Sequence, residues 1–361
     1  MSLGRRLLVT PVTIAGLEIP NRMWVAPMCQ YMAQDGVPND WHHVHLAAFA
    51  NGGFGLILTE STAVAPEGRI TPGDTGLWNS EQQYAWSTVV ASVHARGSRI
   101  GVQLGHAGRK GSTLSPFHGT GSVPAAGGGW QTTAPSATPF GDYAEPASLS
   151  APEIDEIATR FAEAAERAVA AGFDVIEIHA AHGYLLHQFL SPLSNTRTDE
   201  YGGSLENRAR FLIDVCRRVR RSAPDTPLFV RVSATDWEVG GVTVDDTTRV
   251  CVWLRGAGAD FIDVSTGGNT PHPDIPTAPG YQVDIAREVR RACGLPVSAV
   301  GLITEPEQAE KIVAHGDIDA VMIGRAALRD PHWAVHAAKA LGDARLLPQA
   351  PHRERHSAPT T

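Results

Sequence analysis

The sequence has few cysteines and no paired cysteine motif. Four cysteines stand far apart in 361 residues: Cys29, Cys216, Cys251 and Cys293. A disulfide framework needs cysteines in recurring close spacing, and a zinc knuckle needs CxxC pairs. The sequence therefore indicates neither, and it favours a reducing cytoplasm as the location.

Long apolar runs and a surplus of positive charge are also absent. No stretch reaches the length of a membrane span, and Pro11 and Glu18 interrupt the apolar run that follows the first arginine pair. With 38 acidic and 30 basic residues the net charge is -8, so the average field does not attract nucleic acid or an anionic membrane. We predict a cytoplasmic protein with no nucleic-acid partner and no membrane partner.

Eight short apolar segments recur between helix-like spacers, and we predict that each is a strand. Strands that are apolar nearly throughout are typical of a parallel sheet covered on its outside. The predicted strands cover residues 22–27, 55–60, 99–105, 174–180, 227–233, 260–265, 295–301 and 319–324.

The spacers carry helix signals. The helix after Ser150 has a capping-box spacing to Glu153, a periodic apolar face, and Gly172 where it should end. Further helices are predicted at about 81–96, 204–222, 245–257, 281–293 and 305–314. Eight βα units indicate an α/β protein with a (β/α)8 TIM barrel, and a doubly wound open sheet is the alternative. We predict one domain over residues 1–345.

Three segments fall outside the repeat. Residues 12–19 alternate around Gly16 and predict a β-hairpin lid over the barrel floor. Residues 119–148, after the third strand, form a long excursion rich in Gly, Pro, Ser and Thr, in which Trp130 is either a lid residue or exposed. We predict that residues 346–361 form an exposed, partly disordered tail.

In such a barrel the reacting groups lie at the carboxyl ends of the strands. Gly301 follows the seventh strand, and Gly324 with Arg325 follows the eighth. Glycines that allow close backbone approach and one fixed cation suit a phosphate, so a phosphorylated cofactor is implied. The alternative is that the glycines only make tight turns and Arg325 pairs with a surface acid.

A set of motifs resembles the Old Yellow Enzyme family of FMN-dependent ene-reductases. The motifs are "NRMWVAPMCQYM", "GRITPG", "QLGHAGRK", "HAAHGYLLHQFLSPLSNTRTDEYGGSLENRARF", "FVRVSATDW" and "IGRAALRDP", in order from about residue 7 to 341. The cysteine in "PMCQY" is similar to that of the thermophilic-like branch, which includes xenobiotic reductases. The "HAAHGYL" and "SNTRTDEYGGSLENR" motifs are the most specific.

The resemblance implies a non-covalent FMN reduced by NADPH or NADH. It places residues beside the flavin ring, at its pyrimidine edge and at its phosphate. These residues are Ala26, Pro27, Met28, Cys29, Ser61, Gln103, Arg231, Gly301, Gly324 and Arg325. A fixed cation at Arg231 would stabilise the negative charge of the reduced flavin.

The family likeness also assigns the substrate site. His179 and His182 would donate hydrogen bonds to the carbonyl or nitro oxygen of an electron-poor alkene, so that hydride from flavin N5 adds to the β-carbon. Tyr184 would protonate the α-carbon, Tyr31 would touch the substrate, and Cys29 would tune the flavin. In the branch that this cysteine resembles, the C-terminal tail often reaches a neighbouring subunit's site, which implies that role for Arg353 or Arg355 in the tail, residues 346–361. If the chain turns helically after the fourth strand, residues three apart share a face and both imidazoles can reach one atom.

The residues alone leave other interpretations of the histidine pair open. With Glu177 it could form a carboxylate-histidine metal site, although the nearby Arg231 repels a cation, and we predict no metal. The pair could also be hydrogen-bonded histidines in a core turn. Lys110 lies near the active-site rim by family likeness, yet a lysine is usually solvated.

We predict an NAD(P)H-dependent FMN oxidoreductase, an ene-reductase of α,β-unsaturated carbonyl or nitro compounds, that forms a homodimer or homotetramer. One alternative is a flavin barrel that oxidises a hydroxy acid or a carbon–nitrogen bond, with a histidine as base. Others are a sensor without turnover and, more distantly, a metal hydrolase.

Overall fold

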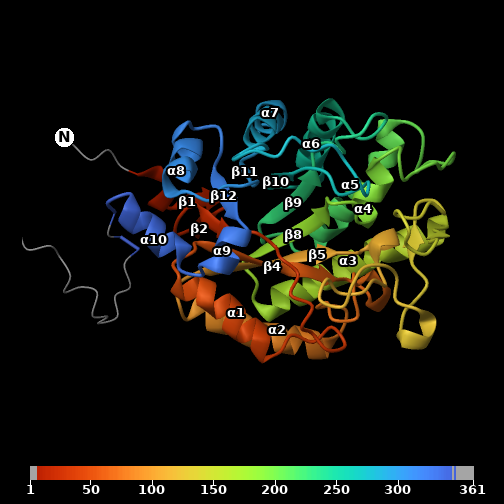
Figure 1. Ribbon diagram of the computed structural model, residues 1–361, viewed down its shortest axis with the longest axis horizontal. Coiled ribbons are helices and arrows are strands. Elements are labelled where there is room, and N and C mark those ends of the chain that lie inside the picture. Colours follow the sequence, from red (N-terminus) through yellow and green to blue (C-terminus); the bar gives the residue numbers. More distant parts are fainter. Residues whose placement is uncertain (1–5, 344, 347–361) are drawn as a thin grey trace, which may run out of the picture.

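Eight parallel strands close into a barrel in the computed structural model, which describes residues 6–343 and 345–346 (Figure 1). The barrel order is β3-β4-β5-β8-β9-β10-β11-β12, and Val321 to Ile323 of the last strand pair with Met23 to Val25 of the first. Each of the eight lies at a predicted strand, so the (β/α)8 barrel is confirmed. The strands are β3 (Met23–Val25), β4 (Leu56–Ala63), β5 (Arg99–Gly105), β8 (Val175–Ala180), β9 (Leu228–Ser233), β10 (Phe261–Ser265), β11 (Val297–Ala299) and β12 (Ala320–Ile323).

Helices surround the barrel and connect its strands (Figure 1). The six predicted helices are found as α2 (Ser80–His94), α3 (Ala151–Ala171), α5 (Leu205–Ser222), α6 (Val244–Ala257), α7 (Val283–Cys293) and α8 (Pro306–Ala314). Four more were not predicted: α1 (Asp40–Asn51), α4 (Leu185–Leu190), α9 (Arg325–Arg329) and α10 (Trp333–Ala340). Short 3-10 turns cover Leu7–Val9, Pro66–Gly68, Gly108–Lys110 and Ala125–Gly127.

Helix α3 shows why these segments are helical. The side chains of Ser150 and Glu153 form the capping box at its start, and Gly172 ends it in the left-handed conformation. Its apolar face buries Ile154 and Phe161 against the sheet and against α5. Within the described residues, none of the helices combines the length and the apolar character that a membrane crossing requires.

The N-terminal hairpin closes one end of the barrel. Strands β1 (Val12–Ile14) and β2 (Leu17–Ile19) pair antiparallel, as predicted. Ile14 and Ile19 are buried in one cluster with Trp24 and Phe229, whose side chains fill the barrel interior. A separate apolar layer lies between the sheet and the surrounding helices. The hairpin therefore covers the end of the barrel opposite the carboxyl ends of the strands.

Residues 119–148 form an excursion beside the opposite end, drawn in yellow at the right of Figure 1. Two short strands, β6 (Thr133–Ala134) and β7 (Ala147–Ser148), are the regular strands in it. Trp130 is half-buried, and its indole N–H donates to the carbonyl of Glu67, so its side chain is held. Apart from residue 346, the predicted tail with Arg353 and Arg355 lies outside the described residues.

Candidate active site

A cavity of about 440 Å³ opens at the carboxyl ends of the strands β8 to β12. Polar, charged and apolar residues line it. Its lining residues are His182, Arg231, Ser265, Tyr281, Gln282, Val300, Gly301, Leu302, Ile303, Thr304, Met322, Gly324, Arg325, Ala326 and Arg329. Five of the predicted site residues are among them: His182, Arg231, Gly301, Gly324 and Arg325.

The two histidines and the tyrosine form one cluster beside this cavity. The ring centres of His179 and His182 are 5.2 Å apart, and those of His179 and Tyr184 are 4.9 Å apart. His182 Nε2 lies 2.8 Å from the hydroxyl of Ser265. In contrast, Nδ1 of His179 is buried without a hydrogen-bond partner in the part of the chain that the structure describes.

The turn that presents His182 is not helical, so the predicted local geometry is wrong. His182 and Gly183 have φ angles of 58° and 73°, and α4 begins only at Leu185. A β-carbon at residue 183 would lie 2.2 Å from the carbonyl oxygen of Gly268, so this position requires glycine. The left-handed turn places His182 in the lining of the cavity and beside the ring of His179.

The cluster is uncharged at neutral pH. Burial, together with the guanidinium of Arg231, places the pKa values of His179 and His182 well below the usual range. Burial raises the pKa of Tyr184 well above its usual value, with Cys29 and Tyr31 adding to the effect. Two neutral imidazoles can each donate one hydrogen bond, and a protonated phenol can donate its proton.

The guanidinium of Arg231 is held in place by acidic groups inside the barrel. Its Nε lies 2.9 Å from Asp263, whose other oxygen accepts a hydrogen bond from Ser298. Gln103 donates to Glu177 at 2.7 Å, and burial together with Asp263 raises the pKa of Glu177. Because the guanidinium also lines the cavity, it presents a fixed cation to a ligand.

The far end of the cavity suits a phosphate. Arg325 and Arg329, one helical turn apart on α9, both line it, and neither forms a salt bridge with any residue the structure describes. Gly301 has a φ of 115° and leaves no room for a β-carbon beside Gln282. The two arginines and the close backbone approach at Gly301 fit the phosphate of the predicted FMN. The distant cation of Arg231 fits its ring. Arg329 was not predicted from the sequence, although its i,i+4 spacing from Arg325 is visible in "GRAALR".

Ser61, Cys29 and Tyr31, predicted from the first two barrel strands, lie near the cluster and are not among the lining residues of the cavity. A β-carbon on Gly105 would lie 2.8 Å from Ser61 Oγ and 3.5 Å from the β-carbon of His179. Burial, with Asp74 and Glu60, raises the pKa of Cys29 well above its usual value, so it is a neutral thiol. Burial also raises the pKa of Tyr31, which has a φ of 59°.

Ala26 and Met28 face a second, much smaller cavity beside His42 and Glu60. Met28 also reaches Gly324, whose β-carbon would lie 3.8 Å from the sulfur. Cys216, Cys251 and Cys293 lie buried in α5, α6 and α7.

Lys110 is half-buried rather than fully solvated. Its ammonium donates to the carbonyl oxygens of His182 and Gly268 at 2.8 and 2.9 Å and lies 5.0 Å from the ring of Tyr184. Burial, with Arg109, lowers its pKa to about 7. Among residues 6–343, 345 and 346, no group of three His, Cys, Asp or Glu side chains is placed to hold a metal ion.

A family model described as the NADH:flavin oxidoreductase / NADH oxidase family matches residues 7–344. An NADPH dehydrogenase of Bacillus subtilis is 44% identical over 339 residues, which cover 93% of this chain and 95% of that protein.

Solved structures share the fold. Morphinone reductase in complex with tetrahydroNAD has a TM-score of 0.76 and 27% identity, covering 92% of this chain and 91% of that one. The old yellow enzyme homologue from Zymomonas mobilis has a TM-score of 0.74 and 29% identity, covering 90% of each chain. The chain spans 52% of the longer 2-naphthoyl-CoA reductase, with 93% of its own length aligned at 27% identity and a TM-score of 0.85.

Proposed function

The chain belongs to the NADH:flavin oxidoreductase / NADH oxidase family, and more narrowly to the Old Yellow Enzyme family, and from this we propose that it reduces activated C=C bonds. It is an NAD(P)H-dependent FMN oxidoreductase. The proposed substrates are α,β-unsaturated carbonyl and nitro compounds. The observation that carries the proposal is the convergence of two neutral imidazoles and one protonated phenol beside a cavity with a fixed guanidinium.

Residues from both ends of the cavity would hold FMN. Arg325, Gly324 and Gly301 would bind its phosphate, and Arg231 and Gln103 its pyrimidine edge. The bound flavin supplies hydride transfer from a nicotinamide to a substrate. Arg231 can favour that chemistry because a cation fixed by Asp263 stabilises negative charge without having to reorganise. Ala26, Pro27, Met28, Cys29 and Ser61 would line the ring.

His179 and His182 would bind the substrate oxygen. Nδ1 of His179 has no other partner, and Nε2 of His182 is engaged by Ser265, which leaves its Nδ1 for the ligand. Both rings are neutral, so they would donate hydrogen bonds to an oxygen atom and draw electron density toward it without delivering a full positive charge. The β-carbon then becomes electron-poor.

Tyr184 would supply the proton to the α-carbon. Its ring contacts His179, and its raised pKa keeps the proton on the phenol until a basic carbon develops. Tyr31 would contact the substrate from the first strand, and the Cys29 thiol would lie near the flavin. The proposed reduction needs an acid, which explains why a tyrosine belongs to the cluster. A hydroxy-acid oxidase would not need a tyrosine as an acid.

A spectroscopic titration tests the proposal. The purified protein should be yellow, should bleach under anaerobic NADPH, and should regain its absorbance when 2-cyclohexenone is added. Lactate, offered to the oxidised protein, should not bleach it. If NADPH bleaches the protein but neither cyclohexenone nor a nitroalkene restores its absorbance, the protein is a flavin oxidoreductase that lacks the proposed alkene reduction. The homodimer or homotetramer and the cytoplasmic location stay predictions.

A further inference from the structure

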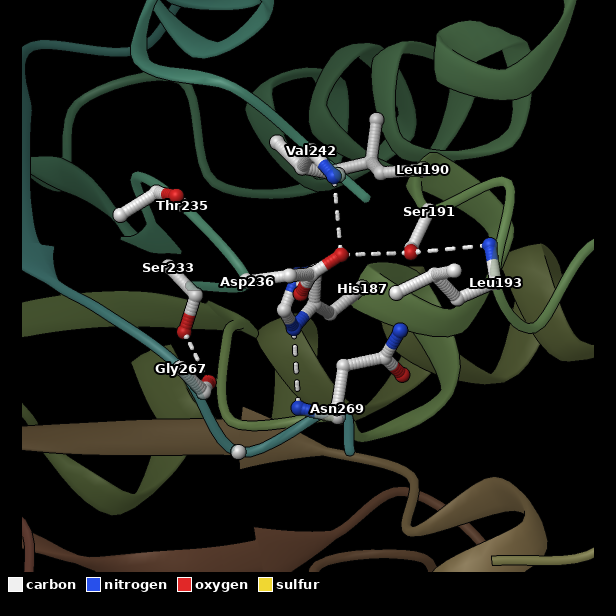
Figure 2. A network of polar contacts seen from close by, with 12 residues as sticks. His187, Leu190, Ser191, Leu193, Ser233, Thr235, Asp236, Val242, Gly267 and Asn269 are labelled. Carbon is white, nitrogen blue, oxygen red and sulfur yellow. Dashed lines mark hydrogen bonds and ion pairs between the residues drawn. The ribbon is translucent and has the colours of Figure 1, made fainter. Parts of the chain in front are cut away.

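A buried carboxylate, imidazole and hydroxyl form a second polar network directly behind the histidine cluster. His187, Ser191 and Asp236 are buried, and Figure 2 shows Asp236 between Ser191 and the backbone of Val242. Ser191 Oγ donates to Asp236 Oδ2 at 2.6 Å, and the Val242 N–H donates to the same oxygen at 2.9 Å. The network does not reach the cavity, so no substrate can touch it.

His187 links this network to the turn of the candidate site. Its Nε2 lies 3.1 Å from Asp236 Oδ1, and neither atom has another hydrogen-bond partner among the described residues. Its Nδ1 accepts the backbone N–H of Gly183 at 2.9 Å. Gly183 stands between His182 and Tyr184, so one peptide group connects the buried pair to both site residues.

The contacts determine the tautomer of His187. A backbone N–H can only donate, so Nδ1 of His187 must carry no proton. The proton of the neutral ring is therefore on Nε2, where it faces Asp236. A carboxylate is the partner that holds it there, because it accepts and never donates when ionised.

The turn needs such an anchor. His182 adopts a φ of 58°, which a side chain with a β-carbon rarely takes and which persists only where the surroundings hold it. The peptide groups around it are all bound. The His182 N–H donates to Ser233, its carbonyl accepts from Lys110, and the Gly183 carbonyl accepts from Gln188 at 2.7 Å.

We propose that Asp236 and His187 are positioning residues of the site. By keeping the His187 proton on Nε2, Asp236 leaves Nδ1 to accept the Gly183 N–H, and this fixes the turn that aims His182 and Tyr184. The inference rests on the proposed function of those two residues. The arrangement of the pair itself is independent of any substrate.

Asp236→Asn tests the tautomer with almost no change in shape. Oδ2 must stay an oxygen because it accepts from the Val242 N–H and the Ser191 hydroxyl, so the new amide NH₂ must face His187. That NH₂ donates to Nε2 and forces the proton onto Nδ1, where it opposes the Gly183 N–H. We expect ¹⁵N NMR of the FMN-loaded protein to show His187 protonated on Nε2, and on Nδ1 in the variant. Cyclohexenone turnover should fall about 10- to 100-fold, as for other partners that orient a functional histidine.

Two substitutions of His187 separate its contacts. In His187→Asn the amide oxygen can replace Nδ1 and accept from Gly183, whereas in His187→Gln the longer amide reaches Asp236 and leaves Gly183 without an acceptor. The Asn variant should keep most of the turnover and slow exchange of the Gly183 amide hydrogen. The Gln variant should lose both the turnover and the slow exchange of the Gly183 amide hydrogen, although each variant removes the same imidazole ring.

The outcomes are distinct. A wild-type His187 protonated on Nδ1, or equal losses in the Asn and Gln variants, would overturn the proposal. For variants that lose FMN or unfold at a lower temperature, hydrogen exchange of the Gly183 amide is the measurement. This exchange shows whether the hydrogen bond from the Gly183 N–H to residue 187 is intact, and it requires no turnover. If the wild type does not reduce cyclohexenone at all, the proposed function fails, and the tautomer and exchange results still decide whether the pair holds the turn.

Discussion

The ammonium nitrogen of Lys110 lies 5.0 Å from the centre of the Tyr184 ring and binds the carbonyl oxygen of His182 at 2.8 Å. One lysine thus contacts the proposed proton donor and the turn that carries a proposed substrate ligand. Its contact with Tyr184 is made to the ring, so the phenolic hydroxyl can be removed without removing that contact.

Tyr184→Phe should separate the two half-reactions. Reduction of the flavin by NADPH needs no proton from this hydroxyl and should change little. Reoxidation by 2-cyclohexenone should slow by about 10²- to 10⁴-fold, the usual contribution of a positioned general acid. Anaerobic stopped-flow absorbance of each half-reaction measures both, and an equal loss in the two would contradict the assigned role.

His179→Ala should weaken the activation of the substrate oxygen. Removing one hydrogen-bond donor from a site that stabilises developing negative charge lowers kcat by about 10²- to 10³-fold. His118→Ala is the matched control because this histidine is exposed and bonds only to Ser115. The assignment would not survive steady-state kinetics in which both variants turn over cyclohexenone like the wild type.

Arg325→Ala should lower the affinity for FMN and leave that for riboflavin unchanged, because riboflavin has no phosphate. A hydrogen bond to a charged group contributes about 1.5–3 kcal/mol, which corresponds to a roughly 10- to 100-fold weaker Kd. Fluorescence titration of the apoprotein with each flavin measures the difference. Equal weakening for both flavins would place the phosphate elsewhere.

Ile19→Ala should lower the free energy of unfolding by about 2–5 kcal/mol, since the side chain is fully buried in the barrel floor. Thr13→Ala, an exposed position on the same hairpin, should change it little. Urea denaturation followed by circular dichroism compares them. Two equal midpoints would show that the hairpin does not contribute to the folded core.

Asp236 should stabilise the fold in a pH-dependent way. Although burial opposes its ionisation, contacts with His187, Ser191 and Val242 lower its pKa to about 2, against about 3.9 in an unfolded chain. Because the folded value is depressed, the stabilisation is present above pH 4 and is lost as the pH falls toward 2. It amounts to about 2–3 kcal/mol. The difference in unfolding free energy between wild type and Asp236→Asn should shrink over that interval, and a constant difference would contradict the assigned ionisation.

The barrel was predictable because each strand is a continuous apolar segment between turn residues. Helix α1 was not, although Asn39 caps it, because His42 takes the place of the usual Glu or Gln in its capping box. At the site, the family resemblance predicted roles for His179, His182 and Tyr184, but it did not predict the left-handed turn. Its geometry depends on Gly268 and Lys110, which lie far away in the sequence. The burial of Lys110 likewise follows from tertiary contacts.

The hairpin β1–β2 covers the end of the barrel opposite the candidate active site. Its tip, Ala15 and Gly16, is exposed, and a β-carbon on Gly16 would meet no atom within 4 Å. In Figure 1 the hairpin lies at the left of the barrel and the excursion after β5 at the right. A chemical tether attached at this tip would therefore anchor the protein to a support with its reactive end turned toward the solution.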